Sequence, residues 1–209
     1  MNANAAVAAD AETIRAYDRS VEKYRQMVTK MPEKKALSRF IDLLPKSALI
    51  LDLGCGLGDS AAAMQQAGLQ VDCMDASPEM VRAAKELFGI EAHQASFADL
   101  DAKNHYDGIW ANFSLLHASK AAFAGHLGAI ATALKAEGMF FLALKLGEGE
   151  ERDSLGRFYA YYSQEELERL LQATGFSITE RLHGSNIGLA GVAEPWIGIF
   201  CRKSDENPI

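Results

Sequence analysis

The chain has 209 residues, a length typical of one compact domain. Hydrophobic residues make up 49% of it and charged residues 23%, which excludes a disordered or collagen-like chain. Its net charge of −7 argues against a nucleic-acid backbone or an anionic membrane surface as a partner, because both carry negative charge themselves.

The cysteines and the N-terminal residues indicate in which cellular compartment the protein is expected. Cys55, Cys73 and Cys201 are an odd number without CxxC spacing, in a chain too long to need disulfide staples. The opening MNANAAVAADAETI lacks the basic residues of a signal peptide, and no apolar run approaches the roughly 18 residues of a membrane span. We therefore expect a cytoplasmic protein without leader or membrane anchor.

Two helices are expected before the first strand. Apolar residues recur at three- and four-residue steps from Thr13 to Met31, which predicts an amphipathic helix behind a frayed tail. Pro32 and Pro45 are expected to bound a second helix that runs through Leu44.

From residue 48 onward, short apolar runs alternate with helical patterns. This alternation predicts right-handed crossovers and a doubly wound α/β fold with a mostly parallel sheet. The last two of the seven expected strands have no helix between them, so they should form an antiparallel hairpin. Strands are expected at 48–53, 69–74, 90–95, 106–111, 138–146, 176–183 and 195–202, and helices at 59–67, 77–88, 119–134 and 163–175.

A glycine-rich segment, LDLGCGLGDS, follows the first expected strand and precedes a helix. Without Cβ atoms at Gly54, Gly56 and Gly58, backbone N–H groups can approach a ligand closely, and the helix N-terminus favours negative charge there. The alternative is a tight turn that only packs the strand against the helix.

An acidic residue ends the next expected strand. Asp75 lies about twenty residues beyond the first glycine, where a carboxylate can accept hydrogen bonds from both hydroxyls of a ribose. Alone it would be read as a helix-capping or solvated residue; together with the glycine segment it indicates a nucleoside site. A nicotinamide dinucleotide fingerprint would need glycine where Asp59 stands, which disfavours an NAD(P)-dependent oxidoreductase.

The pattern from Asp52 through Gly54, Gly56 and Gly58 resembles the first motif of class I S-adenosylmethionine-dependent methyltransferases, an acid followed by GxGxG. HYDGIWANFSLLH is similar to the fourth strand and active-site loop of that family. LKAEGMFFLALKL is similar to its turn and fifth strand, and EELERLLQATGF to its closing helix. Matching segments run from about residue 34 to 203.

The resemblance implies a seven-strand Rossmann-like domain over residues 1–209, with a tail and lid helix at 1–31 and the core at 32–203. It implies S-adenosyl-L-methionine as the cofactor, with its methionine part at Asp52 and the loop backbone and its ribose at Asp75. The implied cofactor-binding residues are Asp52, Gly54, Cys55, Gly56, Gly58, Asp75, Ala76, Met80, Ser96, Phe97 and Asn112, with Tyr17 in the lid. The family often has Gly-Asp after its third strand, where this chain has Gln94 to Phe97; whether Ser96 or Asp99 lies near the adenine amino group stays open.

Methyl transfer is an in-line displacement, so the protein chiefly holds the acceptor and excludes water. His117, just after the fourth expected strand, is the candidate base because histidine titrates near neutrality. It could equally pack or cap locally. The five histidines show no i, i+4 pairing and no Cys or Glu cluster, so we expect no metal site.

The segment GRFYAYY, if extended, places Arg157, Tyr159 and Tyr161 on one face. An arginine beside tyrosines suits a carboxylate or phosphate on an aromatic body, so Arg157 and Tyr159 are candidate acceptor-site residues. A partly buried cover strand explains the pattern nearly as well.

The acceptor is expected to be a small molecule. Asn112-Phe113-Ser114-Leu115 lacks the prolines that base-amino methyltransferases carry after the fourth strand. A non-catalytic cofactor-binding protein of the same fold remains an alternative, because fold does not establish catalysis. We expect a monomer or a homodimer.

Overall fold

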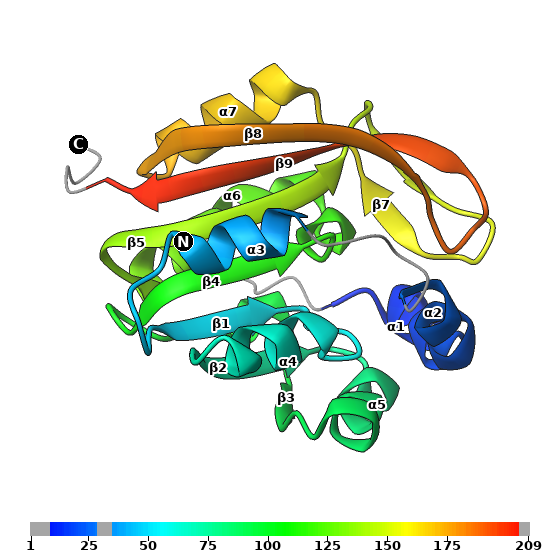
Figure 1. Cartoon of the computed structure of the whole chain (residues 1–209). Helices are drawn as coiled ribbons and strands as arrows, with labels where there is room; N and C mark the ends of the chain where they lie inside the picture. The colour runs from blue at the N-terminus through cyan, green and yellow to red at the C-terminus, as the bar shows by residue number, and fades with distance from the viewer. Residues whose placement is uncertain (1–8, 29–34, 205–209) are drawn as a thin grey trace, which may run out of the picture.

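The computed structural model describes residues 9–28 and 35–204. Within these ranges seven strands form one sheet, bounded as follows: β1 (Leu49–Leu53), β2 (Gln70–Asp75), β3 (Ala92–Gln94), β4 (Tyr106–Asn112), β5 (Leu134–Lys145), β8 (Phe176–Ile187) and β9 (Ala193–Lys203). Their order across the sheet is β3-β2-β1-β4-β5-β9-β8 (Figure 1).

The pairing confirms the expected fold class. β1, β2, β3, β4 and β5 pair in parallel, whereas β9 pairs antiparallel with both β5 and β8. Along the chain, β2 and β3 are added outward on one side of β1, and β4 then pairs with the opposite side of β1. The carboxyl ends of β1 and β4 therefore border the crevice at which open α/β sheets bind ligands.

Three of the described helices begin where a serine side chain satisfies a free N–H group. Ser77, Ser119 and Ser163 each accept a hydrogen bond from the backbone N–H three residues later. The helices are α1 (Ala11–Asp18), α2 (Val21–Val28), α3 (Lys35–Asp42), α4 (Asp59–Gln66), α5 (Pro78–Phe88), α6 (Lys120–Ala133) and α7 (Gln164–Ala173).

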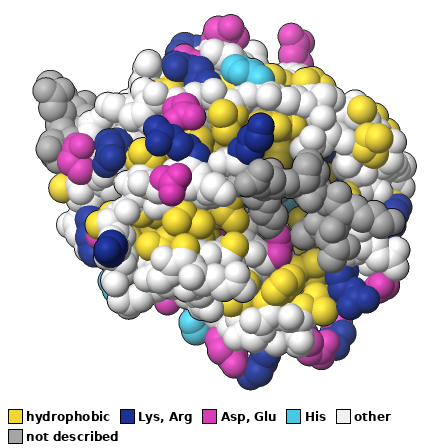
Figure 2. Space-filling view, in the orientation of Figure 1, with side chains coloured by type: hydrophobic (Ala, Val, Ile, Leu, Met, Phe, Trp, Pro, Cys, Tyr) yellow, Lys and Arg dark blue, Asp and Glu magenta, His cyan; other side chains and the backbone are white. Residues whose placement is uncertain are grey.

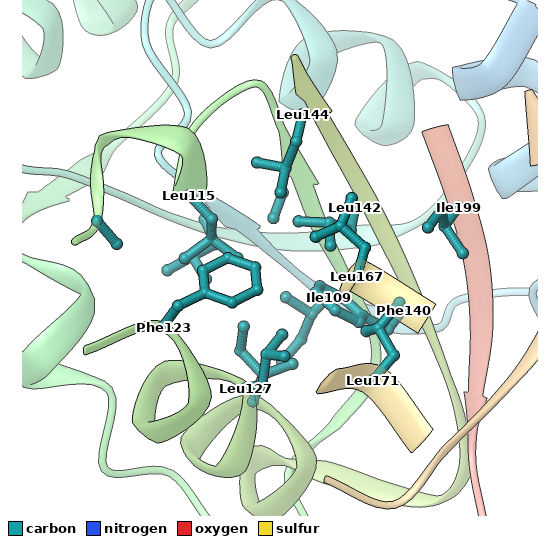
Figure 3. Packing of buried hydrophobic residues seen from close by; sticks show 14 of the residues in the cluster. Ile109, Leu115, Phe123, Leu127, Phe140, Leu142, Leu144, Leu167, Leu171 and Ile199 are labelled. Carbon is teal, nitrogen blue, oxygen red and sulfur yellow. The ribbon is translucent and has the colours of Figure 1, made fainter. Parts of the chain in front are cut away.

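Each face of the sheet is covered by its own helices. Because side chains alternate along a strand, β5 sends Phe141 toward α3 and α4, and Phe140 and Leu142 toward α6 and α7. Figure 3 shows Phe123 and Leu127 of α6 directed at this second face. The core is thus two apolar layers that fix the sheet and leave its carboxyl edge for the site.

Two segments differ from the sequence-based expectation. The helix expected over 13–31 is interrupted at Arg19 and Ser20, giving α1 and α2, because Asp18 is tied to Ser77 by a 2.5 Å hydrogen bond and Ser20 starts the next helix. The end of the expected helix at Met31 and the start of the next at Pro32 lie outside the described residues. β5 begins at Leu134 rather than 138, since Leu134 already pairs with Tyr106.

A small hairpin was not expected from the sequence. β6 (Glu150–Arg152) and β7 (Phe158–Ala160) pair antiparallel between β5 and α7, where the sequence suggested a solvated acidic loop followed by an extended segment. This β6–β7 hairpin lies beside α1, to which Arg152 and Phe158 are hydrogen-bonded. It therefore brings the middle of the chain to the N-terminal helix.

Candidate functional site

The glycine loop between β1 and α4 has the conformation that its sequence implies. Gly54, Gly56 and Gly58 all have positive φ, of 78°, 54° and 79°. A Cβ at Gly54 would overlap that of Ser114, and one at Gly58 would lie 3.1 Å from the Cβ of Ala84. The loop thus fits against its neighbours only because side chains are absent.

Asp75, at the end of β2, holds this loop in place through hydrogen bonds. Its Oδ2 accepts a hydrogen bond from the N–H of Gly56 at 2.8 Å, and its Oδ1 accepts one from the N–H of Ser77 at 2.9 Å. Burial raises the pKa of this carboxyl, and the backbone donors oppose that rise. The sequence placed Asp75 and the loop at one site, and the structure joins them directly.

A cavity of about 320 Å³ opens at the carboxyl edge of the sheet. Segments from α1, α2, the loops after β1 to β4, the start of α6 and the β6–β7 hairpin form its wall. Nine of the expected cofactor-binding residues line it: Tyr17, Gly54, Gly56, Asp75, Ala76, Met80, Ser96, Phe97 and Asn112.

Three expected cofactor-binding residues lie behind the cavity wall rather than on it. Asp52 is 3% exposed within β1, and Gly58 caps the N-terminus of α4. Cys55 is buried, and a hydrogen bond to Cys73 together with burial raises the pKa of its thiol. None of the three therefore contributes to the lining of the cavity.

Ser96 and Asp99, left as alternatives by the sequence, form one local unit. Oδ2 of Asp99 accepts hydrogen bonds from the N–H and the hydroxyl of Ser96, at 2.8 and 2.7 Å. Ser96 lines the cavity, whereas Asp99 is exposed and caps a short 3-10 helix. Of the two, Ser96 is therefore the one that faces the cavity.

His117 connects helix α1 with the β6–β7 hairpin. Its Nδ1 lies 2.6 Å from the carbonyl oxygen of Phe158, and its Nε2 lies 2.8 Å from the hydroxyl of Tyr17. A carbonyl oxygen only accepts, so Nδ1 carries the proton and Nε2 accepts from Tyr17. Burial lowers the pKa of His117 to about 3, so the imidazole is neutral at physiological pH.

Arg157 and Tyr159 do not reach the cavity. Arg157 is 2% exposed, and its Nε and Nη2 both donate to Oδ2 of Asp153, at 2.9 and 2.6 Å. Its Nη1 donates to the Tyr17 hydroxyl at 3.1 Å. Tyr159 is also buried, and its ring packs against that of His117. The structure thus places both residues behind the wall, where they support Tyr17 and His117.

Several residues of the site escaped sequence reasoning. Thr13 accepts a hydrogen bond from the N–H of Phe158, and Asp10 binds Arg152 through two hydrogen bonds. No local pattern connects α1 with a hairpin more than 130 residues away. For Asp153 and Arg157, which form an ion pair, the sequence offers one signal: they are four residues apart.

The described residues also bear on metals, membranes and charged polymers. Between residues 9–28 and 35–204, no three His, Cys, Asp or Glu side chains gather into a metal-binding group. None of the helices in those ranges combines the length and apolar character needed to cross a membrane. Acidic and basic side chains are interspersed on the face shown in Figure 2.

Comparison with known proteins adds a family match over part of the chain. Residues 50–138, from β1 into β5, match the family described as "Methyltransferase domain". This range contains the glycine loop, Asp75 and His117. None of the curated proteins searched matches the sequence.

Solved structures share the fold over nearly the whole chain. The Burkholderia thailandensis 1,6-didemethyltoxoflavin-N1-methyltransferase, crystallised with 1,6-didemethyltoxoflavin and S-adenosylhomocysteine, is 22% identical; the match covers 98% of this chain and 94% of that one, with a TM-score of 0.70. An S-adenosylmethionine-dependent methyltransferase of Methanosarcina mazei is 16% identical (84% and 100% covered, TM-score 0.72). The (4+2)-cyclase SpnF is 18% identical (95% and 97% covered, TM-score 0.72).

Proposed function

We propose that this chain is a class I S-adenosylmethionine-dependent methyltransferase that transfers the methyl group to a small-molecule acceptor; the domain match and the shared fold support this. The observation that carries the proposal is that one cavity is bordered both by the Asp75-fastened glycine loop and by Tyr17 and His117. The first border suits a nucleoside, and the second provides hydrogen-bonding groups for a reacting acceptor.

The cofactor fits the loop by its chemistry. The glycine backbone leaves a cradle in which a Cβ at Gly56 would come within 3.6 Å of the Tyr24 ring. We assign the ribose to Asp75, the methionine part to the backbone near Gly54 and Gly56, and the adenine to the apolar wall. That wall is formed by Ala76, Met80 and Phe97, with Ser96 beside it.

The bound cofactor supplies an activated methyl group on a positively charged sulfur. The chain's own part is to orient the acceptor and to exclude water. Helices α1 and α2 do this as a lid, since Tyr17 and Tyr24 line the cavity and pack edge to face at 6.0 Å. The tail and lid, together with the core, are proposed to form one domain.

The cavity and the charge of the chain favour a small acceptor. A cavity of about 320 Å³ beneath a lid suits a small molecule, and the net charge of −7 is unfavourable for nucleic acid. The Burkholderia relative, which is crystallised with 1,6-didemethyltoxoflavin, is an example of the fold with such a ligand. We also propose a cytoplasmic location, which three free, buried cysteines suit, and a monomer or homodimer.

The cyclase named among the structural relatives shows why activity must be measured. Calorimetry should give binding of S-adenosylmethionine and S-adenosylhomocysteine and none of NAD. Incubation of methyl-labelled S-adenosylmethionine with a metabolite extract should then transfer label to a small molecule. Tight NAD binding without a response to S-adenosylmethionine would overturn the assignment, and cofactor binding without label transfer to any molecule would indicate a non-catalytic or non-methylating protein.

A further inference from the structure

Phe113, directly after β4, has a backbone conformation that its side chain makes unfavourable. Its φ is 55°, in the left-handed region that a bulky residue rarely adopts. Three other non-glycine residues in the described ranges also have positive φ, and all three are exposed and polar: Ser47, Asn104 and Glu137. Phe113 differs from them because it is aromatic, half-buried and lines the cavity. Such strain persists where the surroundings enforce it, and it gathers at ligand-binding sites.

The chain on both sides of Phe113 is fixed by contacts. Its N–H donates to the carbonyl oxygen of Ala143 in β5 at 3.0 Å. The next residue, Ser114, is buried, and its hydroxyl donates to the carbonyl oxygen of Leu53 at 2.6 Å. The Phe113 ring meets Trp196 edge to face, with ring centres 5.9 Å apart. A glycine could follow the same path without strain, so the phenylalanine is explained by its ring and not by the course of the backbone.

Phe113 borders the part of the cavity that the cofactor assignment leaves for the acceptor. In the sheet, β4 lies between β1 and β5, on the side of β1 opposite β2 and β3 (Figure 1). The ribose and adenine are assigned to the ends of β2 and β3, and the methionine part to the backbone near Gly54. A Cβ at Gly54 would overlap that of Ser114, the residue next to Phe113. Phe113 thus follows β4 beside the loop assigned to the methyl-bearing end of the cofactor.

The wall in this part of the cavity is aromatic and apolar. Phe158, at the start of β7, is half-buried and lines the cavity, as do Ile14 and Ala118. The backbone of Phe158 is held on both sides, since its N–H donates to Thr13 and its carbonyl oxygen accepts from His117. Aromatic side chains pack favourably against other aromatic rings in edge-to-face or offset contacts. This part of the cavity therefore suits a flat, unsaturated ring.

We propose that Phe113 determines the specificity for the methyl acceptor, and that the acceptor carries a planar aromatic ring which packs against the ring of Phe113. This proposal rests on the proposed methyltransferase function and adds to it the acceptor class and the residue that recognises it. Phe113 contributes no reacting group. It orients the aromatic ring so that the atom to be methylated faces the sulfur-bound methyl group, which is the part of catalysis that depends on positioning.

The first test compares two uncharged probes with the same carbon skeleton, 2-naphthol and its saturated form decahydro-2-naphthol. Both are titrated by calorimetry into the wild-type protein saturated with S-adenosylhomocysteine. We expect 2-naphthol to bind roughly three- to tenfold more tightly, the scale of one aromatic contact beyond simple burial. The ratio of the two affinities isolates the aromatic contribution, because both probes bury a similar apolar area.

Two substitutions of Phe113 remove its ring in different ways. Phe113→Gly relieves the backbone strain and leaves space, whereas Phe113→Leu keeps an apolar side chain and the strain. Both should bring the affinity ratio close to one, while the affinity for S-adenosylhomocysteine stays within about twofold of wild type. Phe88→Leu is the matched control, since that phenylalanine is exposed at the end of α5 and lies outside the cavity. It should keep the wild-type ratio.

The second test detects the contact itself. In protein that is deuterated except at its phenylalanine rings, 2-naphthol bound together with S-adenosylhomocysteine should give nuclear Overhauser effects to the ring of Phe113. Their loss in Phe113→Leu assigns them to this residue. A Phe113 ring that only packs against Trp196 would give none.

The outcomes separate the two proposals. Failure of S-adenosylhomocysteine to bind to the wild type would contradict the proposed function itself. If it binds, then binding of neither probe, equal binding of both, an unchanged affinity ratio in either Phe113 variant, or the absence of the nuclear Overhauser effects would overturn the acceptor proposal alone. A loss of S-adenosylhomocysteine affinity in both variants would place Phe113 at the cofactor and would overturn it as well.

Discussion

The hydroxyl oxygen of Thr13 accepts a hydrogen bond from the backbone N–H of Phe158 at 2.8 Å, and this bond joins α1 to the β6–β7 hairpin. Asp10 and Tyr17, one turn before and after Thr13, contact Arg152 and Arg157 of the same segment. Helix α1, the first helix of the proposed lid, is therefore docked along its whole length against this segment.

Replacing Thr13 by valine should loosen the lid. Valine keeps the shape but leaves the partly buried N–H of Phe158 without its acceptor, which should cost roughly 1 to 3 kcal/mol. We expect a lower free energy of unfolding in urea and a faster dissociation of S-adenosylhomocysteine. Thr13→Ser retains the oxygen and should behave like the wild type; equal effects of the two variants would show that the bond is unimportant.

Asp75→Ala should weaken cofactor binding for two reasons. It removes the carboxylate assigned to the ribose, and it also deprives the N–H groups of Gly56 and Ser77 of their acceptor. We expect S-adenosylmethionine affinity to fall by roughly 1.5 to 3 kcal/mol in calorimetry. Asp101→Ala, which alters an exposed carboxylate outside the cavity, is the control. An affinity within twofold of wild type in Asp75→Ala would contradict the assignment.

Gly54→Ala and Gly68→Ala compare two glycines with positive φ, of 78° and 87°. Both variants carry the cost of a left-handed alanine, roughly 1 to 2 kcal/mol. Gly54→Ala must in addition displace Ser114, whereas nothing lies within 4 Å of the added Cβ at Gly68. Gly54→Ala should therefore unfold at clearly lower urea concentration and lose S-adenosylhomocysteine binding. Equal midpoints would show that the contact with Ser114 relaxes freely.

His117 should make stability depend on pH. Its pKa is lowered from 6.5 to about 3 by burial, so between these values the unfolded chain binds a proton that the folded chain does not. Stability then falls as the pH drops from 6.5 toward 3, by up to about 1.4 kcal/mol per pH unit. The groups that influence His117 are Tyr17, Arg157, Lys145 and Asp153.

The comparison of urea unfolding at pH 7 and pH 5 in the wild type and in His117→Asn tests this effect. The variant should lose less stability than the wild type on acidification, because asparagine does not titrate. A loss as large as that of the wild type would show that His117 is protonated in the folded state. For the same reason, His117 should not produce an acid limb near pH 6 in the activity profile, as an unperturbed histidine would.

The sequence was sufficient for features that depend on neighbouring residues. The glycine loop, the strand end at Asp75 and the serine caps are local signals, and the structure confirms the loop conformation and the sheet that follows from the alternation. It was insufficient for Arg157, because the pattern of arginine and tyrosines does not reveal that Asp153 binds the guanidinium. Nor does it reveal that Phe158 fixes the tautomer of His117, since a backbone carbonyl has no sequence signature.

The hydrogen bond between Thr13 and Phe158 also has a consequence for synthesis of the chain. Its partners are 145 residues apart, so at 5 to 20 residues per second α1 exists for roughly 7 to 30 s before the hairpin is made. During that time the nascent chain can pair β1, β2 and β4 and can pack α1 against Ser77 and Met80, but it cannot form the hydrogen bonds from α1 to the hairpin. A ribosome-bound chain that ends before residue 150 should therefore leave α1 more sensitive to protease than the finished chain, and full protection should appear only once β7 has emerged.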